Sequence, residues 1–276
     1  MENSNWETGK VTITILGSGT SVPSLRRSSP SVLVETATTM MLIDLGAGTM
    51  RRLLESGRTI SDITHVLFTH FHPDHTGEFV SFIFATKYPE IYRRRIPLVV
   101  GGGKSIGDFY DGLRNVFGHW IELESGMLKL IEFDTEHCDR YDGDRFTVVT
   151  SPLNHIASSV GFRIDIDNGP VIVYTGDTGV CDNVVTLAED ADVLICEAAF
   201  PDEMKIDGHL TPSLAGRIAS AARAKHLVLT HFYPECDNVD MGAQCRRTWS
   251  GPLLLARDLM ELEVDLSGVK VNNQGI

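Results

Sequence analysis

Short apolar runs separated by polar or glycine-rich segments dominate this chain, and runs of this length predict buried strands. Longer apolar segments with helical spacing alternate with them, which is typical of a layered α/β protein. We expect strands at residues 11–16, 32–35, 40–44, 66–68, 96–100, 127–133, 145–150, 160–166, 171–174, 192–195 and 227–229. We expect helices after Gly48, from residue 76 onward, and at 104–117, 213–224 and 253–262.

Two of these segments carry more specific predictions. The strands 160–166 and 171–174 flank Asp167-Asn168-Gly169, and an Asn-Gly turn between two apolar runs predicts a hairpin. The apolar and aromatic segment 79–88 fits two interpretations: a helix packed on the core, or one wall of a substrate cleft.

A dense group of polar side chains interrupts the pattern at Thr69-His70-Phe71-His72-Pro73-Asp74-His75. It follows the apolar run 66–68, so we expect it on a tight loop between a strand and a helix. Imidazole nitrogen and carboxylate oxygen are ligands that suit Zn²⁺ and related first-row cations. His70 and His72 are two residues apart and can point to the same side of an extended segment. Asp74 and His75 belong to the bend that follows and can face a second ion.

Three later strands also end in a residue that could bind a metal. His155 follows the strand at 145–150, Asp177 follows the strand at 171–174, and His231 follows the strand at 227–229. Strand ends along one edge of a layered fold are rigid supports for a site. Each residue alone would more often be structural, but their recurrence beside the cluster predicts one shared metal site.

Composition narrows the classes of protein and partner. The 276 residues are 42% hydrophobic and 22% charged, which fits one large domain or two small ones. The formal net charge of −13 opposes a polyanionic partner such as a large RNA. Arg93-Arg94-Arg95 is the dense basic run, either a solvated surface or a rim that contacts phosphate.

The same features bear on the compartment. The polar first ten residues hold no apolar core for a secretion signal, and no apolar run is long enough to span a membrane. Five scattered cysteines without a Cys-x-x-Cys pair fit reduced thiols, so we expect a cytoplasmic protein.

The motif His-x-His-x-Asp-His at 70–75, followed in order by His155, Asp177 and His231, resembles that of the metallo-β-lactamase superfamily. More closely, the chain resembles the ribonuclease Z-like branch of metal-dependent hydrolases and phosphodiesterases. Residues 15–24 and 42–49 are similar to the branch's N-terminal strands and loops, and Glu197-Ala198-Ala199-Phe200 and Gly208-His209-Leu210-Thr211 to two of its own segments. The resemblance covers most of the chain and implies a single hydrolase domain over residues 1–276, folded as a four-layer αββα sandwich.

The resemblance also implies a ligand set and a mechanism. One Zn²⁺ would be bound by His70, His72 and His155, a second by Asp74, His75 and His231, and Asp177 would bridge them; Mn²⁺ or Fe²⁺ are alternatives. A hydroxide between the two ions would attack the substrate, and Asp74 would also orient it. His209, held by Glu197, resembles the proton donor of the family. His65, His119, His137 and His226 match no motif.

Two departures affect the expected substrate. Bacterial transfer-RNA 3′-processing enzymes of this branch carry a long basic-tipped arm between the third ligand histidine and the bridging aspartate. Here His155 and Asp177 are separated by little more than a hairpin, and the chain is acidic. A position that is often His in those enzymes is Cys196. The leading hypothesis is therefore a dinuclear zinc phosphodiesterase that acts on a small phosphodiester.

Several alternatives stay open at this point. They are a transfer-RNA 3′-processing endoribonuclease, a sulfatase, lactamase or lactonase of the same fold, and a non-catalytic metal-binding protein. Seven ligands argue against the last, because four normally complete a structural zinc site. A homodimer is an oligomeric state that the resemblance allows.

Overall fold

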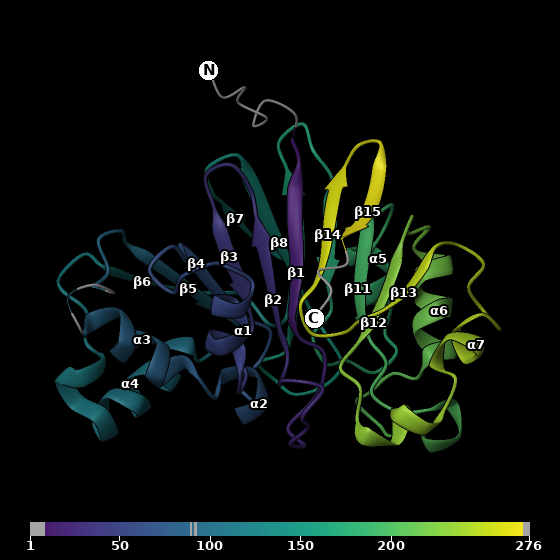
Figure 1. The fold of residues 1–276 in the computed structure, drawn as a ribbon, viewed down its shortest axis with the longest axis horizontal. Helices are drawn as coiled ribbons and strands as arrows, with labels where there is room; N and C mark the ends of the chain where they lie inside the picture. The colour runs from purple at the N-terminus through teal and green to yellow at the C-terminus, as the bar shows by residue number, and fades with distance from the viewer. Residues whose placement is uncertain (1–8, 89, 91–92, 273–276) are drawn as a thin grey trace.

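The computed structural model describes residues 9–88, 90 and 93–272, which form two sheets with helices on both outer faces (Figure 1). The strand order of the eight-stranded sheet is β15-β14-β1-β2-β3-β4-β5-β6, and that of the seven-stranded sheet is β13-β12-β11-β10-β9-β8-β7. The first sheet comprises β1 (Val11–Gly17), β2 (Ser31–Glu35), β3 (Met40–Ile43), β4 (His65–Phe68), β5 (Leu98–Gly102), β6 (Leu128–Glu132), β14 (Met260–Asp265) and β15 (Gly268–Asn272). The second comprises β7 (Asp139–Asp142), β8 (Phe146–Pro152), β9 (Val160–Ile166), β10 (Val171–Tyr174), β11 (Val193–Glu197), β12 (Leu227–Thr230) and β13 (Leu253–Leu255).

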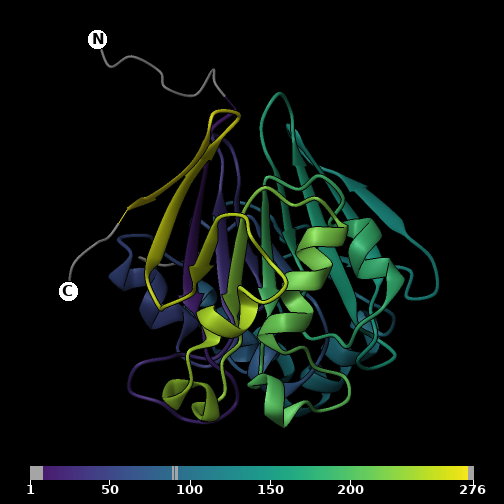
Figure 2. The same ribbon diagram turned by 90° about the vertical axis from the view of Figure 1, so that its right-hand side faces the viewer.

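Helices cover both sheets. In Figure 1, α3 and α4 lie on the left and α6 and α7 on the right. In Figure 2 the green helices of residues 182–221 lie in front of the second sheet. The helices are α1 (Thr49–Glu55), α2 (Pro73–Thr76), α3 (Phe79–Lys87), α4 (Ile106–Phe117), α5 (Asp182–Leu187), α6 (Pro212–Ala221) and α7 (Met241–Cys245), with the 3₁₀ turns η3 (Gly118–Ile121), η4 (Asp202–Met204) and η5 (Pro234–Asn238).

Alternation along the strands explains the layers. In β4, Leu67 packs in the core between the sheets, whereas Val66 and Phe68 pack in the core beneath α1, α3 and α4. A strand buried on both faces reads as a continuous apolar run, which is why β4 was recognisable from sequence. The four-layer αββα sandwich predicted from the resemblance is confirmed.

Parallel pairing brings the site's strands into line. In the first sheet β4 runs parallel to β3 and β5, and in the second β10, β11, β12 and β13 are parallel. Successive parallel strands end at the same edge of their sheet, at the bottom of Figure 1, where α2 lies. The predicted hairpin is also confirmed: β9 and β10 pair antiparallel, and Asn168 in their turn has a positive φ of 55°.

The helix expected at 253–262 is wrong. Leu253–Leu255 is strand β13, parallel to β12, and Met260–Asp265 is strand β14, antiparallel to β1. Between the two strands, Leu259 has a left-handed backbone conformation, with φ at 64°, which interrupts regular secondary structure. In β14 the buried residues are Met260, Leu262 and Val264, a period of two that fits a strand with one face in the core.

Candidate metal centre

The histidine-rich segment leaves strand β4 and enters helix α2. His72 is extended, with φ at −62° and ψ at 148°, and Pro73 occupies the first helical position, where its missing N–H costs nothing. The bend expected around Asp74 and His75 is therefore a one-turn helix. The helix places Asp74 and His75 beside the pair His70 and His72, with the ring centroids of His70 and His75 4.1 Å apart.

Three histidines and one carboxylate form the first group of the centre. The Nδ1 atom of His72 lies 3.0 Å from Nε2 of His70 and 3.1 Å from Nε2 of His155. The Oδ2 atom of Asp177 lies 3.8 Å from Nε2 of His70 and 3.7 Å from Nε2 of His155. These four ligand atoms all lie within 4.8 Å of one another.

Asp74, His75 and His231 form the second group. The Oδ2 atom of Asp74 lies 3.9 Å from Nε2 of His75 and 3.8 Å from Nε2 of His231. The other oxygen of Asp177, Oδ1, lies 3.4 Å from Nε2 of His75 and 3.2 Å from Nε2 of His231. Asp177 thus directs one oxygen to each group, which is the arrangement of a bridging carboxylate.

Unpaired buried atoms test whether this donor set suits a metal ion. Within the described part of the chain, Nε2 of His75, Nε2 of His231 and Oδ1 of Asp177 are buried without a hydrogen-bond partner. Such an atom normally costs about 1–3 kcal/mol, so three at one point call for an explanation. A divalent cation would satisfy all three, and imidazole with carboxylate is the donor chemistry that zinc, manganese and iron accept.

Charge in the centre points to a cation as well. Burial would lower the pKa of His75, but the carboxylates of Asp177 and Asp44 outweigh it and raise that pKa well above its ordinary value. The two buried carboxylates therefore attract positive charge to this point. At His70 burial dominates, with His75 adding to it, and the pKa falls far below the ordinary value, so this imidazole stays neutral and able to bind a metal.

Second partners fix the orientation of the histidines. The Nδ1 atom of His75 donates to Oδ2 of Asp44 at 2.7 Å, and Asp44 also accepts from the backbone N–H of Thr69 at 2.8 Å. The backbone carbonyl of Gly208 lies 2.9 Å from Nδ1 of His155. Such partners set the tautomer and ring orientation of a metal-binding histidine.

Asp44 is the residue in this arrangement that the sequence analysis missed. It directly follows strand β3, as the potential ligands follow their strands, and this signal was available in the sequence. Its side chain is buried and its φ is 60°. The left-handed conformation suits Asp better than most residues.

His209 and Glu197 lie together beside the two groups. The Nδ1 atom of His209 is 3.0 Å from Oε1 of Glu197 and 3.9 Å from Oδ2 of Asp177. Glu197 is buried and accepts three backbone N–H groups as well, from Thr178 at 2.7 Å and from Ala199 and Leu210 at 3.2 Å. Burial would lower the pKa of His209, but the contact with Glu197 outweighs it and raises the pKa.

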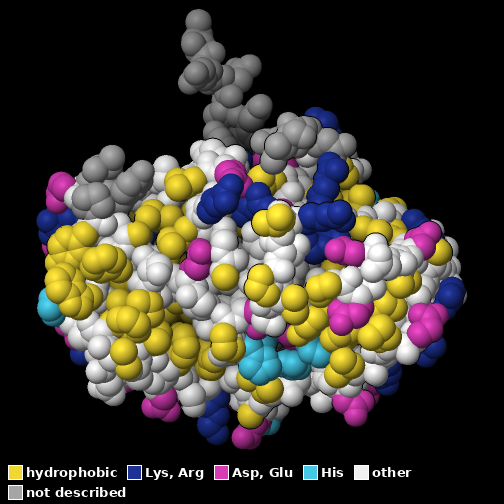
Figure 3. Space-filling view, turned by 60° about the horizontal axis from the view of Figure 1, so that its bottom comes forward, with side chains coloured by type: hydrophobic (Ala, Val, Ile, Leu, Met, Phe, Trp, Pro, Cys, Tyr) yellow, Lys and Arg dark blue, Asp and Glu magenta, His cyan; other side chains and the backbone are white. Residues whose placement is uncertain are grey.

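The centre is mostly buried and reaches the surface on one side, where the side chains of His155 and His209 are 9% and 13% exposed. Figure 3 shows a group of histidine side chains in cyan at the lower centre of this face. A cavity of about 560 Å³ opens beside it, lined by Asn154, His155, Gly179, Val180, Lys205, Asp207, Gly208 and His209. The centre and a solvent-filled space are thus in contact at His155 and His209.

The two interpretations of residues 79–88 can now be compared. Phe79, Phe82 and Ile83 are buried in the core beneath the first sheet, and none of them lines the cavity beside His209. Phe84 and Tyr88, on the outer side, are 43% and 47% exposed. The helix packs on the core, and its outer side adds to the apolar area at the left of Figure 3.

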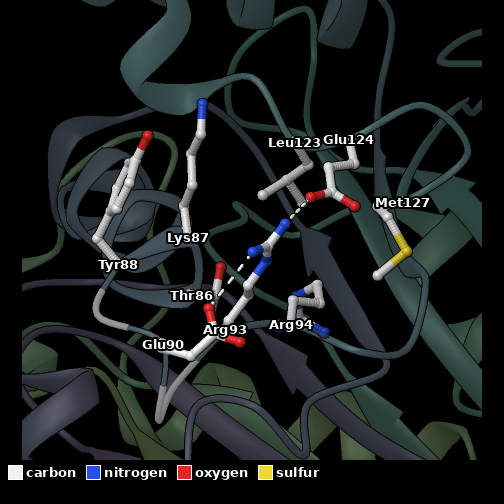
Figure 4. Close-up of a pocket in the computed structure, with 9 residues that line it drawn as sticks. All are labelled: Thr86, Lys87, Tyr88, Glu90, Arg93, Arg94, Leu123, Glu124 and Met127. Atoms are coloured by element: carbon white, nitrogen blue, oxygen red, sulfur yellow. Dashed lines mark hydrogen bonds and ion pairs between the residues drawn. The ribbon is translucent and has the colours of Figure 1, made fainter.

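The basic run 93–95 fits neither of its interpretations as a unit. Arg94 is buried and donates to the backbone carbonyls of Ile63 and Ile60. Arg93 pairs with Glu124 and Glu90 on the surface (Figure 4). The cavity of about 230 Å³ that Arg93 and Arg94 line contains none of the histidines of the centre.

The histidines without a motif lie outside the centre. His65 contacts Thr64 and Tyr141, His137 contacts Asp134, and His226 contacts the backbone carbonyl of Asp192.

No helix among the described residues has the length and apolar character needed to cross a membrane.

Comparison with known proteins agrees with this geometry. A family model described as a β-lactamase superfamily domain matches residues 39–232, which include the seven residues of the two ligand groups as well as His209 and Glu197. The ribonuclease Z of Mycobacterium avium (strain 104) is 26% identical over 277 aligned residues, covering 92% of this chain and 99% of that protein.

Two solved structures are also similar. The metallo-beta-lactamase fold protein YhfI from Bacillus subtilis has a TM-score of 0.78 and 22% identity, covering 92% of this chain and 99% of that one. Human tRNase Z, short form, has a TM-score of 0.75 and 26% identity, with the same two coverages. The chain therefore belongs to the β-lactamase superfamily, as a hydrolase with the metallo-β-lactamase fold.

Proposed function

We propose that this protein is a dinuclear zinc phosphodiesterase that acts on a small phosphodiester. The observation that carries the proposal is the pair of ligand groups that share Asp177, each oxygen of which faces one group. One ion would be held by His70, His72 and His155, and the other by Asp74, His75 and His231, with Mn²⁺ or Fe²⁺ as alternative metals. Two adjacent divalent ions supply a nucleophile near neutral pH and neutralise charge that develops on the phosphoryl oxygens.

The protein's own residues have separate tasks in this reaction. Asp74 offers a second carboxylate oxygen that can orient the attacking water. Glu197 holds Nδ1 of His209, which leaves Nε2 of that ring for the substrate. From there His209 donates a proton to the departing alkoxide, so that the P–O bond breaks without releasing a strongly basic anion.

A small substrate is favoured by the hairpin between His155 and Asp177. Strands β9 and β10 fill this interval, so no arm is available there to grip a large RNA. The net charge of −13 also works against polyanion binding. The protein loaded with zinc should hydrolyse bis(p-nitrophenyl) phosphate, and a chelator should abolish the activity. The proposal would be overturned if the protein failed to hydrolyse bis(p-nitrophenyl) phosphate with every divalent metal but cleaved a lactam, a lactone or a sulfate ester.

A second candidate is transfer-RNA 3′-processing, which the names of the relatives favour. Ribonuclease Z of Mycobacterium avium and human tRNase Z each align with more than nine-tenths of this chain. Specific binding and 3′ cleavage of a precursor transfer RNA at physiological salt would establish this candidate. Weak binding that disappears between about 50 and 200 mM salt would indicate non-specific contact with phosphates.

Two further predictions concern the protein as a whole. A cytoplasmic location is consistent with five cysteines that form no disulfide with one another. A homodimer remains an expectation from the resemblance, and sedimentation velocity at micromolar concentration would measure it.

A further inference from the structure

Lys205 lines the cavity beside the metal centre and has no partner of its own. Its side chain is exposed, and within the described residues no hydrogen bond or ion pair to its ammonium group is found. His155 and His209 line the same cavity of about 560 Å³. A ligand group that fills it would therefore touch both the proposed proton donor and a free cation.

The segment that carries Lys205 is anchored at both ends. Before it, Asp202 accepts the backbone N–H of Ser213 at 3.0 Å, and the N–H of Met204 donates to the carbonyl of Pro201 at 2.9 Å. After it, the carbonyl of Gly208 lies 2.9 Å from Nδ1 of His155. The anchors hold the backbone of Lys205 near the centre while its side chain stays free to bind.

A second cavity extends the cationic surface away from the centre. It has a volume of about 360 Å³ and also includes Lys205, so the two cavities adjoin. Arg217 and Arg247 line it, with Asp202 as its carboxylate. Arg247 pairs with Asp202 at 3.0 Å, whereas no partner of the Arg217 guanidinium is found in the described part of the chain. In a chain of net charge −13, Lys205 and Arg217 offer a path along which an anion can approach the centre.

One apolar side chain lines the first cavity, and two more flank Lys205 in the sequence. Val180 lines it and is 53% exposed, and Met204 and Ile206, on either side of Lys205, are each 46% exposed. The cavity is lined by the ammonium group of Lys205, the carboxylate of Asp207 and the aliphatic side chain of Val180, so a ligand that combines an anion with a ring or hydrocarbon meets both a cation and an apolar surface there.

We propose that this cavity binds the leaving-group side of the substrate and that Lys205 recognises a second phosphate carried by the leaving alcohol. The inference rests on the proposed function, because His209, the proposed donor to the leaving oxygen, lines the cavity. Water supplies the oxygen of the new P–O bond, the bond to the leaving alcohol breaks, and the alcohol oxygen takes its proton from His209. One proton of the water is released to solvent, from which His209 regains its own. The products are a phosphomonoester and an alcohol that keeps its own phosphate.

Matched dinucleotides test the specificity. Thymidylyl-thymidine is compared with the same dinucleotide carrying a terminal phosphate on the leaving nucleoside, which is identified from the products. We expect the added phosphate to lower KM by about tenfold, the effect of one charge-assisted contact at an exposed site. Lys205→Ala should abolish this advantage and leave kcat and the KM of the unphosphorylated dinucleotide unchanged. Arg145→Ala is the control, since Arg145 lines a separate cavity that contains no residue of the centre.

Binding gives a readout that does not depend on turnover. Calorimetry should show that thymidine 3′,5′-bisphosphate binds the zinc-loaded protein about tenfold more tightly than thymidine monophosphate does, and that Lys205→Ala removes the difference. Equal affinities, or equal losses for both nucleotides in Lys205→Ala, would overturn the inference while activity on bis(p-nitrophenyl) phosphate could stand. If the zinc-loaded wild type did not hydrolyse bis(p-nitrophenyl) phosphate but still showed the binding difference, the proposed phosphodiesterase function would be overturned instead.

Discussion

The Nδ1 atom of His209 lies 3.0 Å from Oε1 of Glu197, a carboxylate that is 1% exposed. Glu197 is the last residue of strand β11, and His209 lies just before helix α6, so the contact joins the second sheet to the segment that leads into this helix. Backbone N–H groups already fix the carboxylate. The imidazole is thereby oriented by a rigid partner beside Asp177, an arrangement that suits the proton donor proposed above.

Replacing His209 with Ala should separate substrates by leaving group. Alkyl phosphodiesters need a proton on the departing oxygen, so kcat should fall by about 10²–10⁴-fold. p-Nitrophenolate departs without a proton, so kcat for p-nitrophenyl esters should fall much less. Steady-state kinetics on both substrate types measure the difference, with metal content checked by atomic emission. Equal losses on both types would remove His209 from the donor role.

Replacing Glu197 with Gln provides the matched test of orientation. The amide keeps the size of the side chain but carries no charge to hold the His209 imidazole. We expect the same preference for good leaving groups as in His209→Ala, with a smaller loss of kcat. An unchanged ratio between the two substrate types would show that Glu197 does not position the donor.

Asp44 should control metal affinity without touching the metal. Asp44→Asn replaces one of its two accepting oxygens with a donor group, so that either Thr69 or His75 loses its acceptor. Losses of this kind cost about 10–100-fold in metal affinity. Competition with a chromophoric chelator would measure the zinc dissociation constant. Asp192→Asn is the control, because Asp192 is also buried but binds Lys225 and the N–H of Val171. Equal effects of the two substitutions would contradict the prediction.

His65 gives a prediction for stability against pH. It is buried on β4 beneath Tyr141, and burial, with a contribution from Lys129, lowers its pKa to about 4. The unfolded chain binds a proton there at its ordinary pKa of about 6.5, whereas the folded chain does not until about pH 4. The folded state is therefore penalised as the pH falls from about 6.5 towards 4, and the penalty is absent above pH 6.5.

Urea unfolding of His65→Gln would reveal this penalty. The free energy of unfolding of the wild type, relative to the variant, should fall by about 2 kcal/mol between pH 7.5 and pH 5. Effects of all other groups are shared by both proteins and cancel in the difference. His137→Gln, at an exposed surface position, controls for the loss of an imidazole. A difference that is constant with pH would contradict the assigned burial of His65.

The strand ends were predictable because their signal is local. His70, His155, Asp177 and His231 each follow an apolar run of a few residues, and the structure brings all four together. The buried strands themselves were visible as apolar runs for the same reason. What the sequence could not show was the second partner of each side chain, because the contact of Asp44 with His75 depends on where two loops meet.

Long-range pairing explains the largest error. Residues 253–262 contain enough leucine to suggest a helix, yet the partner of Met260 is Ile15, at the other end of the chain. Pairing with β1 stabilises the extended form, and the alternation of apolar and acidic residues over Met260–Asp265 was the local signal of this strand. Arg94 also depends on partners that are distant in sequence. Its neighbours suggest an exposed basic run, but its buried guanidinium donates hydrogen bonds to the backbone carbonyls of Ile60 and Ile63.

The side chain of Asp258 holds residues 17–20, the loop that follows β1, through hydrogen bonds to Ser18, Ser28 and Arg52. Its side chain is 4% exposed and accepts from the N–H of Ser18 at 2.9 Å, from the N–H of Ser28 at 2.7 Å and from Nε of Arg52 at 3.1 Å. The backbone N–H of Ser18 is thus already paired within the protein. The carbonyl of Ser18 accepts the N–H of Phe232, next to His231.

Asp258→Ala should therefore weaken both the fold and the second ligand group. Removing Asp258 leaves the amides of Ser18 and Ser28 without their acceptor and Arg52 with Glu55 as its remaining carboxylate, with an expected loss of about 3 kcal/mol in the free energy of unfolding. Zinc affinity should fall as well, because the turn that supports His231 loosens. Glu55→Ala is the control: it removes another carboxylate from Arg52 at the surface and should cost less than about 1 kcal/mol. Similar losses in the two variants would show that the loop is held by other contacts, and that His231 is positioned by its strand alone.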